Sequence, residues 1–459
     1  MNDYLIDAPA GATTEIIALD AAGFERWRAE QATEAAAWVA ATGFAAEPGG
    51  HCLMSAPDGG LARVIVGVAA ERDPWAFAGL PGALPVGDYR LATGGDAVSA
   101  DDAAFGWALG CYRFSRYSAA KRPPARLVWP EGCDRARVAA LVGAVTLVRD
   151  LVNTPAEDMG PGELADAACA LADAHGGRCA VTVGDDLLGA GYPAIHAVGR
   201  AVARAPRLID LTWGEADAPR ITLVGKGVCF DSGGLDLKPA SGMKLMKKDM
   251  GGAAHVLGLA SALMARGARL RLRVLVPAVE NSVSGNALRP LDVIASRKGP
   301  TIEIGNTDAE GRVILADALA EADRERPDLL LDCATLTGAA RVALGTDLPA
   351  LFTPSDALAA DLLRHAATER DPLWRMPLWA PYRALLDSKI ADINNIADGS
   401  YGGAITAALF LKDFVTETEN WGHVDLMAWN LKDRPGRPVG GEAVGLRTLL
   451  ALIEERIDA

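Results

Sequence analysis

The sequence offers little that would suit a membrane or a secreted protein. Its longest apolar run, at 138–148, is interrupted by glycine and threonine. A membrane-spanning helix needs ~20 apolar residues, so this run is too short. The N-terminus has no basic stretch followed by an apolar core, and no signal peptide is expected. We therefore expect a cytoplasmic protein without a membrane partner.

Cysteine and histidine are also scarce. The seven cysteines are scattered and form no CxxC pair, which argues against a disulfide framework and against a thiolate zinc site. The six histidines are isolated, there is no HExxH, and no GxSxG elbow supports a serine nucleophile. We expect the histidines to be structural or on the surface. The chain also lacks GxxxxGK[ST], so a phosphate-binding loop is disfavoured.

What is present fits an ordered globular protein. Half of the 459 residues are hydrophobic and 23% are charged, so intrinsic disorder is excluded as the main state. A chain of this length usually forms more than one core. The net charge is −14, from 45 basic and 59 acidic residues, which argues against nucleic acid as a main partner.

The pattern of apolar segments predicts two α/β domains. A proline pair at 123–124 and the Pro-Glu-Gly turn at 130–132 suggest a boundary, giving domains at 1–130 and 131–459. In the first, we predict strands at 62–68 and 126–129 and a helix at 101–117. In the second, apolar strands alternate with helices, which indicates a sheet covered on both faces. Its predicted strands are 180–183, 207–212, 221–225, 270–279, 301–304 and 329–334, and its predicted helices are 135–151, 163–175, 253–266, 313–324, 357–370, 405–416 and 446–457.

Three loops of the second domain carry acidic residues where strands or helices begin or end. The first loop, 225–239, carries Asp231, the second, 246–252, carries Asp249, and the third, 306–312, carries Asp308 and Glu310. If these loops converge, four carboxylates share one pocket, and each pair ~4 Å apart repels by about 4 kcal/mol at an effective dielectric of ~20. Either the acids take up protons or divalent cations lie among them. Two divalent ions balance the four acids, and such ligands suit Mg, Mn or Zn.

Each of these residues also has a structural interpretation. Asp308 or Glu310 alone could cap the helix that begins near Val313. In an extended segment, Asp308, Glu310 and Arg312 would point to the same side. Lys226 ends an apolar strand, so we expect it to be partly buried. In contrast, we expect three other lysines of this region, Lys244, Lys247 and Lys248, on a solvated face.

The spacing of these residues resembles the leucine (cytosol) aminopeptidase family. The resemblance is carried by Lys226-x4-Asp231-x6-Lys238-x10-Asp249 and by the segment Asn-Thr-Asp-Ala-Glu-Gly-Arg at 306–312, and it covers about residues 140–459. It implies a smaller N-terminal α/β domain, with an assembly or accessory role, and a larger catalytic domain with a mixed sheet flanked by helices. The segment at 440–447 and the pair Met427-Ala428 depart from the family, which leaves a preference for leucine open.

The resemblance also implies roles for individual residues. One ion would be bound by Lys226, Asp231, Asp249 and Glu310, and the other by Asp231, Asp308 and Glu310. Lys238 and Arg312 would act in catalysis, and Met246 and Thr335 would line the pocket for the first side chain.

By the same resemblance, the enzyme removes the N-terminal residue of peptides with a hydroxide that bridges two divalent ions. These ions would be Zn or Mn, with Mg or Co as alternatives, and bicarbonate at Arg312 would shuttle the proton. The family implies a homohexamer. Two other functions stay open: a two-metal hydrolase of another substrate, such as a phosphoester, and an additional DNA-binding role.

Overall fold

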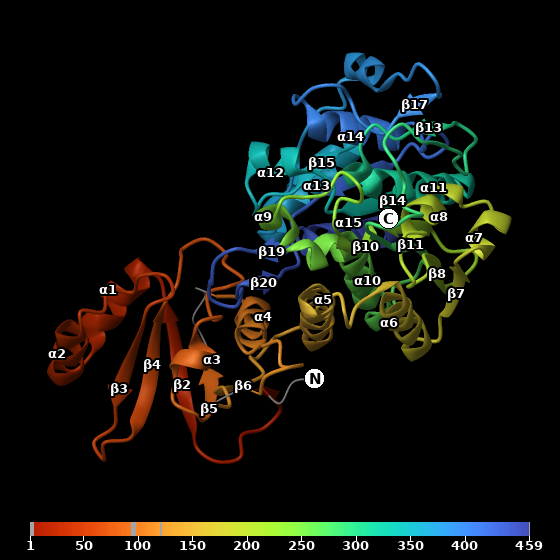
Figure 1. Cartoon of the computed structure of the whole chain (residues 1–459). Coiled ribbons are helices and arrows are strands. Elements are labelled where there is room, and N and C mark those ends of the chain that lie inside the picture. Colours follow the sequence, from red (N-terminus) through yellow and green to blue (C-terminus); the bar gives the residue numbers. More distant parts are fainter. Residues whose placement is uncertain (1–3, 93–97, 120–121, 459) are drawn as a thin grey trace. The chain divides into compact units, whose positions relative to one another are not determined.

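The computed structural model describes residues 4–92, 98–119 and 122–458 (Figure 1). It separates into two compact units. The N-terminal unit comprises Met1–Thr146 and Lys432–Val439, and the C-terminal unit comprises Leu147–Leu431 and Gly440–Ala459. Each unit has its own sheet and helices, so the prediction of two α/β domains, the first smaller than the second, is confirmed.

The N-terminal unit contains a six-stranded sheet in the order β1-β6-β5-β2-β4-β3, parallel except for the pair β3–β4. The helix predicted at 101–117 ends earlier, at Gly110. The strands are β1 (Leu5–Ile6), β2 (Thr13–Leu19), β3 (His51–Ser55), β4 (Leu61–Gly67), β5 (Asp88–Leu91) and β6 (Arg126–Val128), and the helices are α1 (Ala21–Glu30), α2 (Thr33–Thr42), α3 (Leu80–Ala83) and α4 (Ala100–Gly110). A long helix, α5 (Arg135–Asn153), leads into the C-terminal unit.

The C-terminal unit contains a nine-stranded mixed sheet. Its order is β16-β15-β18-β14-β9-β11-β8-β7, and β10 pairs in parallel with the C-terminal part of β11, residues 278–281. These strands are β7 (Arg178–Val183), β8 (Arg207–Gly214), β9 (Arg220–Gly225), β10 (Gly227–Asp231), β11 (Arg271–Asn281), β14 (Leu329–Ala334), β15 (Ala350–Phe352), β16 (Trp374–Arg375) and β18 (Trp421–Asp425). Two small sheets hold β12 (Val293–Ile294), β13 (Ile302–Glu303) and β17 (Ile393–Asn394), and β19 (Trp429–Asn430) and β20 (Gly440–Gly441).

Helices cover both faces of this large sheet. Every residue of β14, and all but the first of β9, is buried, and a strand buried at consecutive positions must be covered on both sides. One group of helices packs around α11 and another around α10. The helices are α6 (Pro161–Ala174), α7 (Asp186–Gly189), α8 (Pro193–Gly199), α9 (Ala240–Met243), α10 (Gly251–Ala265), α11 (Glu310–Arg324), α12 (Gly338–Leu344), α13 (Asp356–Glu369), α14 (Gly403–Lys412) and α15 (Leu446–Asp458), with 3-10 turns η1 (Met246–Met250), η2 (Thr307–Ala309) and η3 (Ala380–Leu386).

The cysteines form a single disulfide. The sequence argued against a disulfide framework and did not predict this one bond, between Cys169 of α6 and Cys179 of β7. The two residues are only ten positions apart, on a helix and the strand that follows it, and packing α6 on β7 brings them together. The other five cysteines are free thiols. Among the described residues, no helix is both long and apolar enough to cross a bilayer.

Candidate metal centre

The first group of site residues lies where β9 passes into β10. Residues 220–225 pair with β11 and β14, and residues 227–231 continue along β11. Lys226 stands between these two strands, with its amide bonded to the carbonyl of Cys333 and its carbonyl bonded to the amide of Ala253. Asp231 is the last residue of β10. The sheet therefore holds Lys226 and Asp231 at its edge through backbone hydrogen bonds.

The second group comes from the start of α11. A side chain at Gly311 would place its Cβ 2.5 Å from Cε of Lys226, so glycine lets the helix approach this lysine without displacing it. The sequence analysis considered an extended segment from Asp308 to Arg312, but this segment is helical. Asp308 lies in η2, and Glu310 and Arg312 lie in the first turn of α11. Neither acid caps the helix. Asn306 accepts the amide of Asp308 instead.

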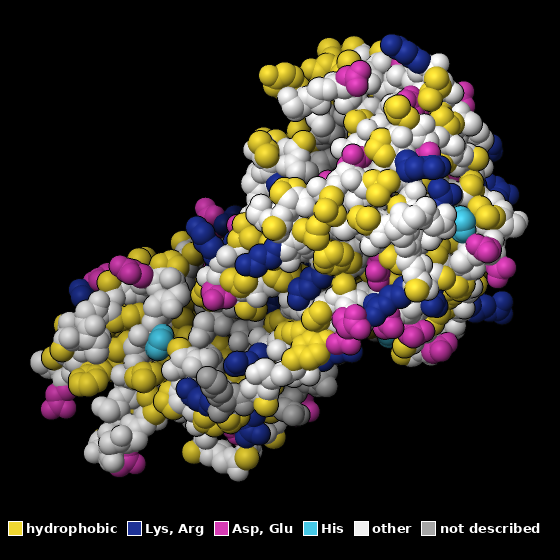
Figure 2. Space-filling model, viewed as in Figure 1, with side chains coloured by type: hydrophobic (Ala, Val, Ile, Leu, Met, Phe, Trp, Pro, Cys, Tyr) yellow, Lys and Arg dark blue, Asp and Glu magenta, His cyan; other side chains and the backbone are white. Residues whose placement is uncertain are grey.

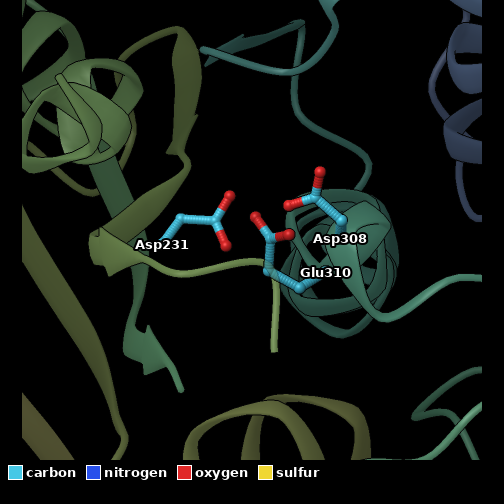
Figure 3. Close-up of side chains that lie close together, drawn as sticks. All are labelled: Asp231, Asp308 and Glu310. Atoms are coloured by element: carbon cyan, nitrogen blue, oxygen red, sulfur yellow. The ribbon is translucent and has the colours of Figure 1, made fainter. Parts of the chain in front are cut away.

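Three carboxylates meet at this edge. Asp231, Asp308 and Glu310 each offer one oxygen, and these oxygens lie within 4.8 Å of one another, a spacing that could hold a metal ion. Figure 3 shows their carboxylates turned toward one another from β10, η2 and α11. Asp231 and Glu310 are buried, and Asp308 is partly exposed. The side of Asp308 is therefore the side from which solvent reaches this carboxylate cluster.

Two lysines contact the cluster, and one of them, Lys226, also joins it to the fourth carboxylate, that of Asp249. The ammonium of Lys226 lies 2.6 Å from Asp249 and 3.0 Å from Glu310. Lys238 contacts Asp231, at 2.7 Å, and Asp308. The structure thus brings all four predicted acids and both predicted lysines into one site. A third ammonium, that of Lys248, lies 4.0 Å from Asp249, so three lysines face four carboxylates and the acids are not fully offset.

The incomplete offset changes how the acids titrate. Burial and the nearby Asp231 raise the pKa of Glu310 to about 8, although Lys226 opposes the shift. Burial and Asp231 also raise the pKa of Asp308. For Asp249, burial favours the neutral acid, but Lys226 and Lys248 outweigh it and lower the pKa. Near neutral pH, part of the cluster therefore prefers to hold a proton unless another cation compensates it.

The unsatisfied oxygens indicate where such a cation would fit. Asp249 Oδ2, Asp308 Oδ1 and Glu310 Oε1 are buried and accept no hydrogen bond of good geometry, although each lies beside a lysine ammonium. Buried carboxylate oxygens are normally hydrogen-bonded or bound to a metal. Their number, charge and convergence fit divalent cations with oxygen ligands.

The remaining predicted residues surround this cluster. Arg312 is buried; one Nη donates to the carbonyl of Asn395, while its Nε has no partner. Burial lowers the pKa of Arg312 to about 10, against the attraction of Glu310. Thr335 donates from its hydroxyl to Asp249, at 2.8 Å. Met246 opens η1 and is partly buried.

Two lysines do not lie where the sequence placed them. We expected Lys244, Lys247 and Lys248 on a solvated face, and this holds for Lys244, which is exposed. Lys247 is partly buried and donates to the carbonyl of Asn153. Lys248 is only 1% exposed, and burial lowers its pKa to about 8. The tight 3-10 turn explains the difference, because it turns successive residues in different directions.

Sequence reasoning missed two asparagines that hold the acidic loops. Asn281, the last residue of β11, donates to Asp231 at 2.9 Å and to the carbonyl of Thr307 at 3.0 Å. Its position, a polar residue at the carboxyl end of an apolar strand, is a signal that could have revealed it. Asn395 accepts from the amides of Gly305 and Asn306. Its place in a short, irregular segment gave no comparable signal.

Comparisons with known proteins show the family of this chain. The family model described as "Cytosol aminopeptidase family, catalytic domain" matches residues 146–450, and the M17 aminopeptidase N-terminal domain matches residues 15–130. Peptidase B of Pectobacterium carotovorum is 46% identical over 321 residues, which cover 67% of this chain and 73% of that protein. A probable cytosol aminopeptidase of Syntrophotalea carbinolica is 44% identical over 368 residues, covering 76% of this chain and 74% of that protein.

Solved structures give the same result. The crystal structure of a cytosol aminopeptidase from Coxiella burnetii is 46% identical, with a TM-score of 0.95, and the match covers 99% of this chain and all of that one. The bottromycin maturation enzyme BotP in complex with Mn is 36% identical, with a TM-score of 0.87, and the match covers 97% of this chain and all of that one. The chain therefore belongs to the cytosol aminopeptidase family of metal-dependent peptidases.

Proposed function

We propose that the C-terminal unit releases the N-terminal residue of peptides and that its carboxylate cluster holds two divalent cations. The observation that carries the proposal is the convergence of four acids around Lys226 and Lys238, with three buried carboxylate oxygens that face a lysine ammonium but accept no hydrogen bond of good geometry. Zn or Mn would be the ions, with Mg or Co as alternatives. A pair of such ions would supply a Lewis acid for the scissile carbonyl and a hydroxide near neutral pH.

The ligands divide into two sets that share two members. Lys226, Asp249, Asp231 and Glu310 would bind one ion, and Asp308, Asp231 and Glu310 the other. Asp231 and Glu310 are suited to bridging, because Glu310 contacts Lys226, Asp231 contacts Lys238, and a carboxylate oxygen of each lies within 4.8 Å of the other. Lys226 ligates only as the neutral amine, so its proton must leave when the ion binds.

Two basic residues would serve the reaction without binding the ions. Lys238 lies beside Asp231 and Asp308, where its ammonium can stabilise the charge that develops on the carbonyl oxygen. The planar guanidinium of Arg312 has a free Nε, which suits a planar anion such as bicarbonate. Asp249 would orient the amino group of the substrate, and Met246 and Thr335 would line the pocket for the first side chain.

A direct assay tests this function. Leucyl- and alanyl-4-nitroanilide should be hydrolysed when Mn or Zn is present, and the activity should vanish after chelation and return when the ion is restored. A phosphomonoester measured in parallel tests the alternative of a two-metal phosphoesterase. Hydrolysis of the anilides that survives thorough metal removal would contradict the proposal, as would hydrolysis of the phosphoester alone.

We further propose that the protein works in the cytoplasm as a homohexamer. Support for assembly comes from an apolar surface segment of the C-terminal unit, 374–401, where hydrophobic side chains gather at the top of Figure 2. Its exposed members are Trp374, Trp379, Tyr382, Leu385, Ile390 and Tyr401. Exposed apolar patches of this kind mark interaction surfaces. The N-terminal unit would have an accessory or assembly role. Light scattering coupled to size exclusion measures the mass directly.

A further inference from the structure

The loop that carries Lys238, residues 233–238, is joined to the acidic turn η2 through one threonine. The hydroxyl of Thr307 donates to the carbonyl of Gly233, at 2.7 Å, and accepts the amide of Asp236, at 2.9 Å. The amide of Thr307 donates in turn to Asp236 Oδ2, at 2.7 Å. This loop, called the lysine loop below, and the acidic turn are therefore connected by hydrogen bonds in both directions.

Little else sets the backbone position of the lysine loop. Its apolar side chains are not packed away, because Leu235 is 41% exposed and Leu237 is 59% exposed. Among the described residues, its other backbone hydrogen bonds run only to Asp231 and Ser232, which directly precede it. A segment without buried apolar side chains depends on hydrogen bonds to keep a fixed position. For the lysine loop, the bonds that reach another part of the chain are those with Thr307.

The acidic turn on the other side of this contact is held independently. The carbonyl of Thr307 accepts the side-chain amide of Asn281, at 3.0 Å. Asn395 accepts the backbone amides of residues 305 and 306, at 2.8 and 3.2 Å. These bonds do not involve the lysine loop, so they remain when the loop moves. Breaking the contact would therefore displace Lys238 rather than the acids of the turn.

The position of the lysine loop matters because of what Lys238 faces. Its ammonium contacts Asp231, at 2.7 Å, and Asp308, so it lies against the carboxylate cluster. Asp236 precedes Lys238 by two residues and is the member of the loop whose side chain bonds to the acidic turn. A shift of the backbone at Asp236 would move the ammonium away from these two acids.

We propose that Asp236 is a positioning residue, which aligns Lys238 for the reaction by accepting the amide of Thr307. The inference rests on the proposed function, in which Lys238 stabilises charge on the carbonyl oxygen, and deepens it by naming the residue that aligns this group. The charge develops only in the transition state, so a misplaced ammonium lowers kcat and leaves KM largely unchanged. A displacement of ~1 Å is enough to cost about 100-fold in rate.

The test compares Asp236→Ala with Asp236→Asn and with a matched control, Asp392→Ala. Asparagine keeps an oxygen that accepts the amide of Thr307 but removes the charge, so it separates the hydrogen bond from the carboxylate. Asp392 accepts the amide and the hydroxyl of Thr301, each at 2.8 Å. The control thus removes an Asp–Thr pair of the same kind outside the carboxylate cluster.

With leucyl-4-nitroanilide and Mn, kcat of Asp236→Ala should fall by about 10- to 100-fold, while KM stays within about threefold. Asp236→Asn and Asp392→Ala should keep kcat within about threefold of the wild type. The rise in melting temperature on adding Mn should be the same in Asp236→Ala as in the wild type, because other residues hold the acids. Damage to the whole site would lower kcat and the rise together.

Two further measurements ask whether Asp236 acts through Lys238. In a Lys238→Met background, Asp236→Ala should change kcat by less than about twofold, since residues that act through one group are not additive. Hydrogen exchange of the peptide 232–239 should be faster in Asp236→Ala than in the wild type and unchanged in Asp236→Asn. Exchange is measured without substrate, so it does not depend on the proposed function.

The outcomes separate the two proposals. If the wild type hydrolyses no anilide, the proposed function fails, whereas equal hydrogen exchange in Asp236→Ala and the wild type overturns the role of Asp236 in either case. A folded Asp236→Ala with kcat within threefold of the wild type also overturns it, as does a further tenfold loss in the Lys238→Met background. Should Asp236→Ala not fold, Thr307→Val removes the hydroxyl that joins loop and turn at nearly the same shape, and the same criteria apply.

Discussion

Both units of this protein place acidic side chains beside the end of a sheet strand, but they differ in how far basic side chains neutralise these acids. In the N-terminal unit, a cavity of about 260 Å³ lies beyond the end of β4. There Arg72 donates twice to Asp102 of α4, at 2.7 and 2.8 Å, so the acid is matched by a base. In the C-terminal unit, four acids face three lysines. The first arrangement is complete within the chain, and the second calls for a bound cation.

The comparison teaches that a parallel sheet with helices does not by itself make an active site. What distinguishes the C-terminal unit is a group of carboxylates that its lysines do not fully neutralise, held in place by backbone hydrogen bonds and close glycine contacts. If this distinction is correct, perturbing the acids of the two units should have opposite consequences: loss of activity in one, and loss of stability alone in the other.

The largest effect is expected from Glu310→Ala. This change removes a carboxylate that would bridge both ions, so kcat/KM for leucyl anilide should fall by about 10³-fold or more. Steady-state assays at saturating Mn measure the loss. Glu417→Ala is the control in the same unit, because Glu417 forms an exposed ion pair with Arg326. A Glu310→Ala protein within tenfold of the wild type would refute the bridging role.

Binding of the ions should also stabilise the C-terminal unit without any substrate. Adding Mn or Zn to chelator-treated protein at about 100 times the dissociation constant should stabilise the native state by about 2.7 kcal/mol. Scanning calorimetry would show this as a rise in melting temperature. Asp231→Asn should reduce the rise, whereas Asp102→Asn in the N-terminal unit should leave it intact. An equal rise in Asp231→Asn would count against the site.

The next largest effect is a loss of stability of the C-terminal unit as the pH falls. Burial lowers the pKa of His255, in α10, from its ordinary value of 6.5 to about 4. Above pH 6.5 the residue is neutral in both states and contributes nothing. As the pH falls toward 4, the unfolded chain gains a proton that the native one lacks, so stability falls, by about 2 kcal/mol at pH 5.

Urea unfolding of the wild type and His255→Gln, at pH 7 and pH 5, measures this effect. The variant should lose less stability between the two pH values, although it is less stable at pH 7, because His255 accepts the amide of Val444 and bonds to the carbonyl of Gly251. Equal losses in both proteins would rule out His255 as the source.

The smallest effect is expected from Asp102→Ala in the N-terminal unit. The change removes two charge-assisted hydrogen bonds from Arg72, which is itself about a third exposed, so the loss of stability should be only about 1–2 kcal/mol. Leucyl kcat/KM should stay within twofold of the wild type. A large loss of activity in a folded variant would mean that the carboxylate cluster of the C-terminal unit depends on Asp102 of the N-terminal unit.

The sequence predicted the parts of the fold that have strong periodicity. β9, β14, α10 and α11 match runs of apolar residues, and the acidic residues next to them were identified as site candidates. The short strands β15 and β18 and the turn η1 were not predicted, because their residues form hydrogen bonds with distant segments and have no periodicity of their own. For the same reason, the sequence could not show which lysine of the pair 247–248 is buried.

The disulfide and the asparagines illustrate a second limit. Cys169 and Cys179 meet because α6 packs on β7, and sequence spacing alone does not report that packing. Asn281 and Asn395 act through amide groups whose partners lie far along the chain. A local pattern reveals charged residues at strand ends more readily than the neutral groups that fix their positions.

Asn395 has a consequence for how the third acidic loop moves. Its side-chain amide bonds to the backbone at Gly305, Asn306 and Ala309, and its own carbonyl accepts the guanidinium of Arg312. One residue thereby couples the rigidity of the loop to that of β17, some eighty residues later in the chain. The positions of Asp308 and Glu310 therefore depend on hydrogen bonds to a segment that lies outside the acidic loops.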